Sequence, residues 1–352
     1  MSASVEIRPG TSADDEARDA FVRAHERGTF FHLAGWRRVV ERVFGHDPAD
    51  LLAFRGGELA GVLPLMRCPA LLGVRSLISM PYAVYGGAIG LDHGAERALV
   101  AAAVELAERD RVGHLELRYL QKPEPAALTD GLVETDLYWT FIKDLPEKEE
   151  DVLARMPKKA RAEARKARTR HGLEISRGEW YVEDLYRLFL RNKHGLGSPG
   201  MPPTYFRELL DEFGREAHVH LVRQGREPLA AVMSFAFGDT LIAYYSGTAP
   251  GVDRTVSASN FMYLALQEWG VRQGYRRFDF GRSRKGAGAF DFKVHQGFEP
   301  APLHYRYHLV RHRELPSFTP SNPRTRVLRR TWSRMPQWLV RRLSNRLSRY
   351  LP

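Results

Sequence analysis

Residues Phe278–Phe298, FDFGRSRKGAGAFDFKVHQGF, carry the pattern from which the fold of this chain is inferred. The first residues predict the end of a strand, the middle predicts a loop of basic side chains and glycines, and Gly288–Gln296 predict a helix. Because ligands of α/β sheets bind at the carboxyl ends of strands, an anion could bind beside the loop cations Arg282, Arg284 and Lys285. The glycines of the loop would let backbone amides approach that anion. A solvated basic turn is the alternative, and the stretch is no Walker loop, since no Gly-Lys-Ser/Thr opens the helix.

Outward from this stretch, the sequence predicts one order of elements twice. The second half predicts a basic helix, helices at 182–190 and 203–213, three strands within 218–248, a helix at 257–273, a strand at 276–280, the helix above and a closing strand at 303–310. The first half predicts a strand and a helix within 5–24, a hairpin within 51–67, a strand and Gly-rich loop at 77–89, a helix at 95–110 and a strand at 114–119. Two copies of one α/β plan explain this order, although the identity between them is too weak to prove a duplication.

The composition is that of a globular protein. A length of 352 residues suits two domains, and 43% hydrophobic residues are enough to build a core in each. Cys68 is the only cysteine, which excludes an internal disulfide and a cysteine-rich metal site. The first thirty residues lack the pattern of an export signal, and no stretch approaches the roughly 20 apolar residues of a membrane-spanning helix. We therefore expect a cytoplasmic protein.

The net charge of +11 is concentrated in two segments. Between Arg155 and Arg170 there are eight cations and one acid, Glu163, and from Leu315 to the end there are nine arginines and no acid. The two segments together carry +16, so the rest of the chain is close to −5. This distribution predicts two contacts with anionic partners.

The first basic segment predicts a helix that faces a polyanion. Pro157 suits the first turn of a helix and Gly172 its end, so Lys158–His171 should form one helix. Its cations are too many for one face, which favours tRNA, an undecaprenyl-diphosphate lipid or a membrane surface as the partner. The side chains expected to contact it are Lys158, Lys159, Arg161 and Arg165. The alternative is a plain solvated face.

The second basic segment, residues 315–352, predicts an amphipathic helical tail with a break at Pro336. Arginines occupy one side of the tail, and apolar residues recur at helical spacing on the other: Leu328, Trp332, Met335, Leu339, Leu343, Leu347 and Tyr350. With Trp338 added, this pattern suits a helix that lies in a membrane interface. The alternative is a helix docked on the preceding domain.

This order of elements resembles that of the GNAT acyltransferase fold, and tandem copies with a basic junction helix resemble the FemAB-like family of acyl and aminoacyl transferases. The resemblance covers about residues 1–312 and is most specific in PKKARAEARKARTRHGLEI, residues 157–175, and in the stretch quoted first. With PYAVYGGAIG, residues 81–90, and the arginine-rich tail, the chain looks closest to the FemAB branch found beside exosortase (PEP-CTERM) and exopolysaccharide genes. The resemblance implies the fold class α/β (α+β), with GNAT-like domains at 1–145 and 146–314, a junction helix at 157–171 and a tail at 315–352.

The resemblance also implies a set of site residues. Phe292 and Lys293 match a Phe-Lys pair that FemAB-like enzymes place at the acyl-transfer centre, where Lys293 would hold the developing oxyanion. Apart from the resemblance, Asp279 and Asp291 flank the loop, and either could orient Lys293 or receive the proton of the attacking amine, which makes Asp291 the third catalytic candidate. A structural ion pair is favoured for both aspartates, and a surface position is the alternative for Lys293. From the residues themselves, the loop cations Arg282, Arg284 and Lys285 would contact substrate. The Gly-rich and Pro-rich loops would add lining residues, although plain turns are the alternative for these: Tyr82, Tyr85, Lys193, His194 and Tyr205.

Two departures from the family pattern concern the substrates. GVDRTVSASN, residues 251–260, stands where GNAT enzymes carry the Arg/Gln-x-x-Gly-x-Gly/Ala loop that binds the pyrophosphate of coenzyme A, so acetyl-CoA is not indicated. Arg37 and Arg38 follow Trp36, but the Pro-rich loop offers only Gly200 and Met201, which puts the donor and a muropeptide acceptor in doubt. We expect no metal and no permanently bound cofactor, and a donor that is an aminoacyl-tRNA, an acyl carrier protein or an acyl-CoA.

These observations together predict a cytoplasmic, peripheral membrane acyltransferase. It would join an activated acyl or aminoacyl group to an amine on a cell-envelope or exopolysaccharide precursor, with a saccharide or lipid-linked acceptor and an anionic membrane surface as partners. Two alternatives remain open at this point. One is a non-catalytic adaptor that tethers a polysaccharide assembly system to the membrane, and the other is a basic RNA-binding protein.

Overall fold

The computed structural model describes residues 4–71, 73–124, 129–315 and 329–352. The chain forms two compact units, each built from segments that are distant in the sequence. Unit 1 comprises the described residues within Met1–Tyr138, Pro302–Ser317 and Arg349–Pro352, and unit 2 those within Trp139–Ala301 and Phe318–Ser348. The division therefore differs from the predicted boundaries at residues 145 and 314.

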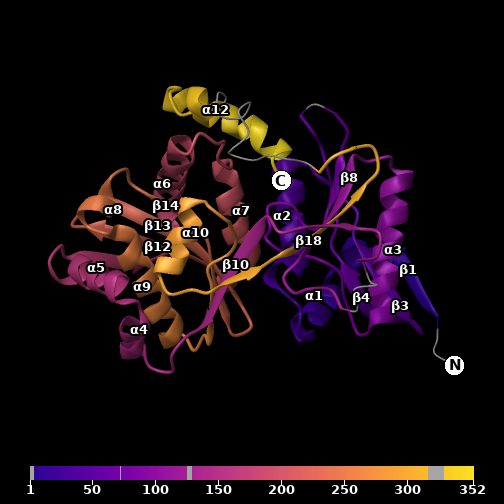
Figure 1. Cartoon of the computed structure of the whole chain (residues 1–352), viewed down its shortest axis with the longest axis horizontal. Coiled ribbons are helices and arrows are strands. Elements are labelled where there is room, and N and C mark those ends of the chain that lie inside the picture. Colours follow the sequence, from indigo (N-terminus) through magenta and orange to yellow (C-terminus); the bar gives the residue numbers. More distant parts are fainter. Residues whose placement is uncertain (1–3, 72, 125–128, 316–328) are drawn as a thin grey trace. The chain divides into compact units, whose positions relative to one another are not determined.

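Unit 1 contains two sheets and three helices among its described residues (Figure 1). In chain order its elements are β1 (Val5–Pro9), α1 (Asp15–Ala24), α2 (Ala34–Phe44), β2 (Asp47–Pro48), β3 (Leu51–Arg55), β4 (Glu58–Leu63), β5 (Met66–Cys68), β6 (Ser76–Ile78), β7 (Ile89–Gly90), α3 (His93–Arg109), β8 (His114–Tyr119), β9 (Val133–Thr135) and β18 (His304–Leu309). The sheets have the strand orders β1-β3-β4-β7 and β2-β5-β6-β8-β18-β9. Helix α3 packs its Leu99 and Ala103 into the core of this unit. Helix α2, which we did not predict, buries Trp36.

The last strand of unit 1 corrects an expectation. The closing strand at 303–310 was expected to complete the second copy, but β18 pairs antiparallel with β8 and β9. The place it would have taken is filled by β10 (Tyr138–Asp144), which pairs with β15 (Arg277–Asp279) in unit 2. Alternation along a strand indicates which face is buried, but it carries no information on which sheet edge the strand completes.

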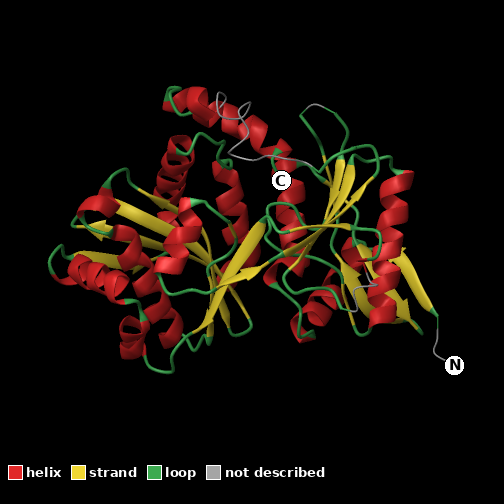
Figure 2. Ribbon diagram, in the orientation of Figure 1, coloured by secondary structure: helices red, strands yellow, loops and turns green. Residues whose placement is uncertain are grey.

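Unit 2 is built around one large sheet (Figure 2). Besides β10 and β15, the elements of unit 2 are, in chain order, α4 (Glu149–Arg155), α5 (Lys158–Thr169), β11 (Leu173–Arg177), α6 (Val182–Gly195), α7 (Pro203–Phe213), β12 (Ala217–Gln224), β13 (Glu227–Phe237), β14 (Thr240–Thr248), α8 (Val252–Thr255), α9 (Ala258–Arg272), β16 (Ser283–Arg284), α10 (Gly288–His295), β17 (Pro300–Pro302) and α12 (Gln337–Leu347). The strand order is β11-β12-β13-β14-β15-β10-β16, with β17 paired to β10. The helices and strands predicted between residues 158 and 296 are thus present, with ends that shift by a few residues.

The two faces of this sheet are covered by different helices. On β13, Ala230 and Val232 pack in the core that includes the apolar side of α9. Phe235 lies three positions after Val232 on β13, and its ring meets Phe213 of α7. Since successive side chains of a strand point to opposite faces, α9 covers one face and α6 and α7 cover the other.

Strand β14 contains the irregularity that shapes the site. Its register with β13 shifts between Met233 and Ser234, so that Tyr244 is an extra residue opposite the partner strand. Beyond this bulge the facing is reversed, and Tyr245 points to the α6 and α7 side, where its ring meets Phe189. The parallel pairing of β14 with β15 covers Thr240 to Ile242 only. The two strands therefore separate immediately before the bulge.

The basic helix and the tail both pack on unit 2. Helix α5 buries Ala160, Ala164 and Ala167 and packs on α9, which leaves most of its cations exposed. Helix α12 begins after Pro336, as the predicted break requires, and buries Val340 and Ser344. Leu328, Arg324 and Arg326 of the predicted tail lie outside the described residues. Among the described residues, every helix is too short or too polar to cross a membrane.

Candidate functional site

The loop that follows β15 is held in place by Lys293. Gly281 has a left-handed backbone conformation with φ of 65°, and its amide donates a hydrogen bond of 2.7 Å to the buried carboxylate of Asp279. From α10, Nζ of Lys293 donates to the carbonyl oxygens of Gly281 at 2.9 Å and Arg282 at 3.1 Å. The side chains of Phe141 and Phe280 flank the ammonium group, each with its ring centroid 5.1 Å away. Lys293 is therefore enclosed beneath the loop, with 8% of its surface exposed.

Three cations converge around this loop. Burial lowers the pKa of Lys293 to about 7, and the Asp279 carboxylate opposes this shift while the Arg282 guanidinium adds to it. On the last turn of α6, burial also lowers the pKa of Lys193, and Arg282 again adds to the shift. Arg282 thus lies close enough to both lysines to disfavour their charged forms. Like charges gathered in a sheltered place favour the binding of an anion, which would relieve their repulsion.

A pair of tyrosines lies beside these cations. The hydroxyl groups of Tyr205, on α7, and Tyr245, on β14, are 2.9 Å apart, and both residues are buried. Burial raises the pKa of Tyr245 well above its usual value, with the neighbouring Tyr205 contributing in the same direction and Arg282 opposing it. The structure therefore brings Lys193, Tyr205, Arg282 and Lys293 of the predicted site residues into one neighbourhood of unit 2.

Other predicted residues near the loop have different surroundings. The ring of Phe292 packs on the rings of Tyr263 and Phe280, so it belongs to the core edge beside the site. Asp291 is exposed in the first turn of α10, two residues before Lys293 and on another side of the helix. Lys285 is exposed, with its Nζ 5.7 Å from the ring centroid of Trp139, and Arg284 is half-buried in β16.

His194 follows Lys193 at the end of α6. The imidazole is half-buried, and its Nε2 is buried without a hydrogen-bond partner among the described residues. A buried ring nitrogen of this kind can accept or donate one further hydrogen bond, so His194 stays a candidate for ligand contact.

The predicted acceptor wall of unit 1 is part of its core. Tyr82 is 6% exposed and Tyr85 is 2% exposed. The Tyr82 hydroxyl lies 2.9 Å from Nε2 of His46, and the ring of Tyr85 packs on Phe31. Residues 77–90 are all buried, because side chains from distant segments bind the carbonyl groups of this loop; Arg118 donates to the carbonyl of Ala83 at 2.8 Å. The two tyrosines therefore support a loop and do not line a surface.

The amino-terminal end of α9 is occupied by carboxylates of the chain itself. Asp253 accepts hydrogen bonds from the amide and the hydroxyl of Ser259, both at 2.7 Å. Glu163, the acid of the basic helix, accepts one of 2.6 Å from the Ser257 hydroxyl. A helix amino terminus attracts anions, so these two carboxylates fill the place that a phosphate group would otherwise take.

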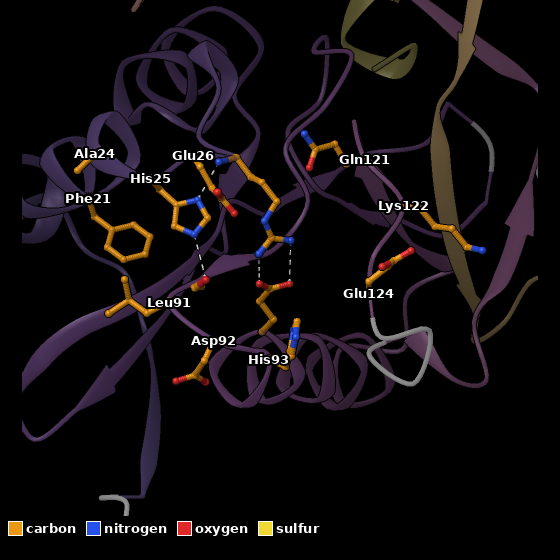
Figure 3. A pocket seen from close by; sticks show the side chains of 13 residues that line it. Phe21, Ala24, His25, Glu26, Leu91, Asp92, His93, Gln121, Lys122 and Glu124 are labelled. Carbon is orange, nitrogen blue, oxygen red and sulfur yellow. Dashed lines mark hydrogen bonds and ion pairs between the residues drawn. The ribbon is translucent and has the colours of Figure 1, made fainter.

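Unit 1 contains a pocket of about 840 Å³ that we did not predict (Figure 3). His25 is fixed there by Nε2, 3.0 Å from the Gly90 carbonyl oxygen, and by Nδ1, which accepts from the Arg27 amide at 3.1 Å. The Arg27 guanidinium pairs with the buried Glu96 carboxylate, so both charges are compensated. The residues that line the pocket include both acids and bases, such as Glu26 and Lys122. The pocket could hold a polar molecule, but it lacks the gathered positive charge found in unit 2.

Two important residues were missed by sequence reasoning. Tyr245 lies in an apolar strand pattern, and only the bulge at Tyr244 turns it toward the site. Asp253 looked like part of a departure from a known motif. It lies within the short helix α8, and the N-cap of α9 is Ser257, so no local capping signal identifies its hydrogen bonds to Ser259. Among the described residues, no group of three or more His, Cys, Asp or Glu side chains is placed to hold a metal ion.

Comparisons with known proteins agree with this geometry. Residues 154–294 match the model of an acetyltransferase (GNAT) domain. The crystal structure of FemX matches with a TM-score of 0.67 and 14% identity, over 87% of this chain and 98% of that one. A tandem GNAT protein from the clavulanic acid biosynthesis pathway matches with a TM-score of 0.58 and 16% identity, over 89% and 100% of the two chains.

A third match is the C-terminal domain of a putative lysylphosphatidylglycerol synthetase from Agrobacterium fabrum, with a TM-score of 0.55 and 14% identity, over 84% and 92% of the chains. No curated protein sequence matches this chain. At these identities the structural likenesses show the fold, and the prediction of two tandem GNAT-like folds is confirmed. The exosortase-associated branch stays a prediction.

Proposed function

We propose that this acyltransferase, whose second unit carries the GNAT domain, joins an activated acyl or aminoacyl group to an amine on a cell-envelope or exopolysaccharide precursor. The observation that carries the proposal is the convergence of Lys193, Arg282 and Lys293 where β14 and β15 separate. The end of a parallel strand pair is a place where α/β proteins bind ligands. A reaction that develops negative charge on a carbonyl oxygen would be stabilised there.

The chemical step is aminolysis of an ester or thioester. The amine nitrogen of the acceptor attacks the donor carbonyl carbon, and a C–N bond forms as the carbonyl oxygen becomes negative. The C–O or C–S bond to the carrier then breaks, and the proton lost by the amine ends on the released alcohol or thiol. No oxidant or reductant is needed.

Lys293 and Arg282 have different tasks in this proposal. Two hydrogen bonds of the Lys293 ammonium hold the loop carbonyls, so it fixes the loop and adds positive charge from beneath. Arg282, carried by that loop, would contact the oxyanion or a phosphate of the donor. Phe292 keeps the aromatic wall beside Lys293, and Asp291 has no assigned part in the step.

The donor in this proposal is not held as coenzyme A is in GNAT enzymes. The carboxylates of Asp253 and Glu163 at the amino terminus of α9 would repel a pyrophosphate group at that end. The exposed cations of α5, which include Lys159 and Arg165, would instead hold a polyanionic carrier such as tRNA or an acyl carrier protein. Lys158 and Arg161 would extend the same surface.

We also propose that the protein works at the inner face of the plasma membrane, on a saccharide or lipid-linked acceptor. Val340 and Ser344 on one side of α12 are buried, so in this proposal the opposite side of the helix makes the membrane contact. Its outward face carries Trp338, 67% exposed, with Arg342 and Arg346. Arginines near an anionic bilayer contribute about 1 kcal/mol each, which suits a peripheral contact.

The test is a donor screen with purified full-length protein. Aminoacyl-tRNA, acyl carrier protein and acyl-CoA would each be mixed with amine-bearing saccharide and lipid-linked acceptors, and amide products would be detected by mass spectrometry. We expect an amide with tRNA or carrier-protein donors, and a loss of about 100-fold in kcat/KM for Arg282→Gln. Arg226→Gln, which removes an exposed cation in the turn between β12 and β13, is the control and should retain activity. Absence of amide with all three donors would overturn the proposal.

A further inference from the structure

The tail holds the loop that joins α6 to α7. This α6–α7 loop comprises residues 196–202. At its start, Nε and Nη2 of Arg329 donate to the Leu196 carbonyl oxygen at 3.2 and 2.8 Å. Near its end, the Gly200 amide donates to Oγ of Ser344 at 3.1 Å. Residues 329–348 therefore bind the loop at two places.

Between these two points the backbone of the tail lies directly against the loop. Gly197 has a φ of 70°, and a Cβ atom built on it would lie 2.5 Å from the Arg329 carbonyl oxygen and 2.8 Å from the Arg329 Cβ. Only glycine fits at such a distance. The contact is anchored nearby by the side chains of Trp332 and Val340, both buried.

The same loop is bonded to residues of the site. The amides of Gly197 and Ser198 donate to the carbonyl oxygens of His194 at 2.9 Å and Lys193 at 3.0 Å. At the other end, the Tyr205 amide donates to the Pro202 carbonyl oxygen at 3.1 Å, next to the start of α7. A displacement of the loop would therefore move the end of α6 and the start of α7, which carry Lys193 and Tyr205.

We propose that the C-terminal tail is a clamp on the α6–α7 loop and that it positions Lys193 and Tyr205 for anion binding at Arg282 and Lys293. This inference rests on the proposed function, because the positioned groups belong to the site described there. Arg329, Gly197 and Ser344 are positioning residues, which act through the loop without touching a substrate. The outward face of α12 stays open, so the clamp leaves the surface proposed for the membrane contact exposed.

The test compares two glycine substitutions in the full-length chain. Gly197→Ala introduces the clash with the tail, whereas Gly225→Ala has the same kind of backbone, with φ of 60°, and nothing within 4 Å of the added Cβ. Both variants carry the cost of a positive φ, so their difference isolates the tail contact. The readouts are the dissociation constant of sulfate, used as the probe anion, and KM against kcat in the amide assay.

We expect Gly197→Ala to weaken sulfate binding and to raise KM by about three- to tenfold with kcat nearly unchanged, and Gly225→Ala to leave both at wild-type values. Should Gly197→Ala fail to fold, Ser344→Ala removes the acceptor of the Gly200 amide without strain. Ser333→Ala is its control, because the Ser333 hydroxyl binds the Arg330 carbonyl and not the loop.

The outcomes separate the clamp from the proposed function. Faster hydrogen exchange at Gly200 with unchanged sulfate binding would mean a merely structural contact and would overturn the clamp. If sulfate binding of the wild-type protein is insensitive to Arg282→Gln, the site itself is wrong, and both proposals fall. Loss of sulfate binding in Arg282→Gln with wild-type binding in Gly197→Ala and Ser344→Ala would remove the clamp alone.

Discussion

In the wild-type protein, Lys293 should make the free energy of unfolding rise and the anion affinity fall between pH 7 and pH 9. Replacement of Lys293 by methionine should remove both of these pH dependences. Methionine has a similar length and no charge, so it keeps most contacts with Phe141 and Phe280 and removes the ammonium. In the wild-type protein the pKa of Lys293 is lowered from 10.5 to about 7 by burial. Between these two values the unfolded chain binds the proton that the folded chain has released, so the free energy of unfolding rises with pH.

The size of this effect follows from the shift. With pKa values of 10.5 unfolded and about 7 folded, burial of Lys293 costs about 4 kcal/mol at pH 7 and about 2 kcal/mol at pH 9. The wild-type protein should therefore gain about 2 kcal/mol from this group between pH 7 and pH 9, and Lys293→Met should lose that gain. Anion affinity should move the other way, since the charged fraction of Lys293 falls from about one half to about 1%, which weakens binding by up to about 50-fold.

The assay is urea unfolding of the full-length chain at pH 7 and pH 9, with a sulfate titration at each pH, because the charge of sulfate is constant over this range. Lys143→Met is the matched control. Lys143 lies in the same unit with its Nζ 4.2 Å from the Phe298 ring centroid, and burial, then Arg155, lowers its pKa to about 8. Its replacement should remove about 1 kcal/mol of the pH-dependent gain and leave the pH dependence of sulfate binding intact. Equal pH slopes of stability and of sulfate affinity in wild type and Lys293→Met would refute the reasoning.

Three further predictions concern other parts of unit 2. Burial lowers the pKa of His220 to about 3, with a neighbouring histidine and an arginine adding to the shift, so the free energy of unfolding should fall as the pH drops below about 6.5. His220→Phe keeps a ring against the aromatic neighbour and should recover about 1.4 kcal/mol of this free energy at pH 5.5 in urea unfolding. If the variant recovers nothing, the shift is contradicted. In calorimetry the wild-type protein should not bind coenzyme A. The double variant Asp253→Asn, Glu163→Gln should raise the affinity for coenzyme A by about tenfold or more, because it removes the two carboxylates at the amino terminus of α9. Tight binding of coenzyme A by the wild-type protein would contradict the proposal that these carboxylates repel the pyrophosphate. The double variant Lys159→Gln, Arg165→Gln should make the plot of log binding constant for tRNA against log salt concentration less steep by about 1 to 2. An unchanged slope would mean that tRNA does not bind at these two side chains.

Much of the site neighbourhood could be predicted from local pattern. The spacing of apolar residues and the glycines and prolines between them predicted most helices and strands of unit 2, because these signals act within a few residues. Lys293 was named through a resemblance to a known motif. The structure places it beneath the loop and not on the surface, and its catalytic role stays a prediction. Arg282 was named with Arg284 and Lys285, but the chain alone could not tell which of the three lies close to Lys193 and Lys293.

The sequence by itself determined the order of elements, the two concentrations of positive charge and the resemblance to a known fold, since each depends on neighbouring residues. Tertiary structure decided the rest. Pairing with a distant edge placed β18 in unit 1, one extra residue in β14 turned Tyr245 toward α6, and packing buried Tyr82 in the core of unit 1. These outcomes depend on contacts between segments far apart in the chain, whose energies no local pattern contains.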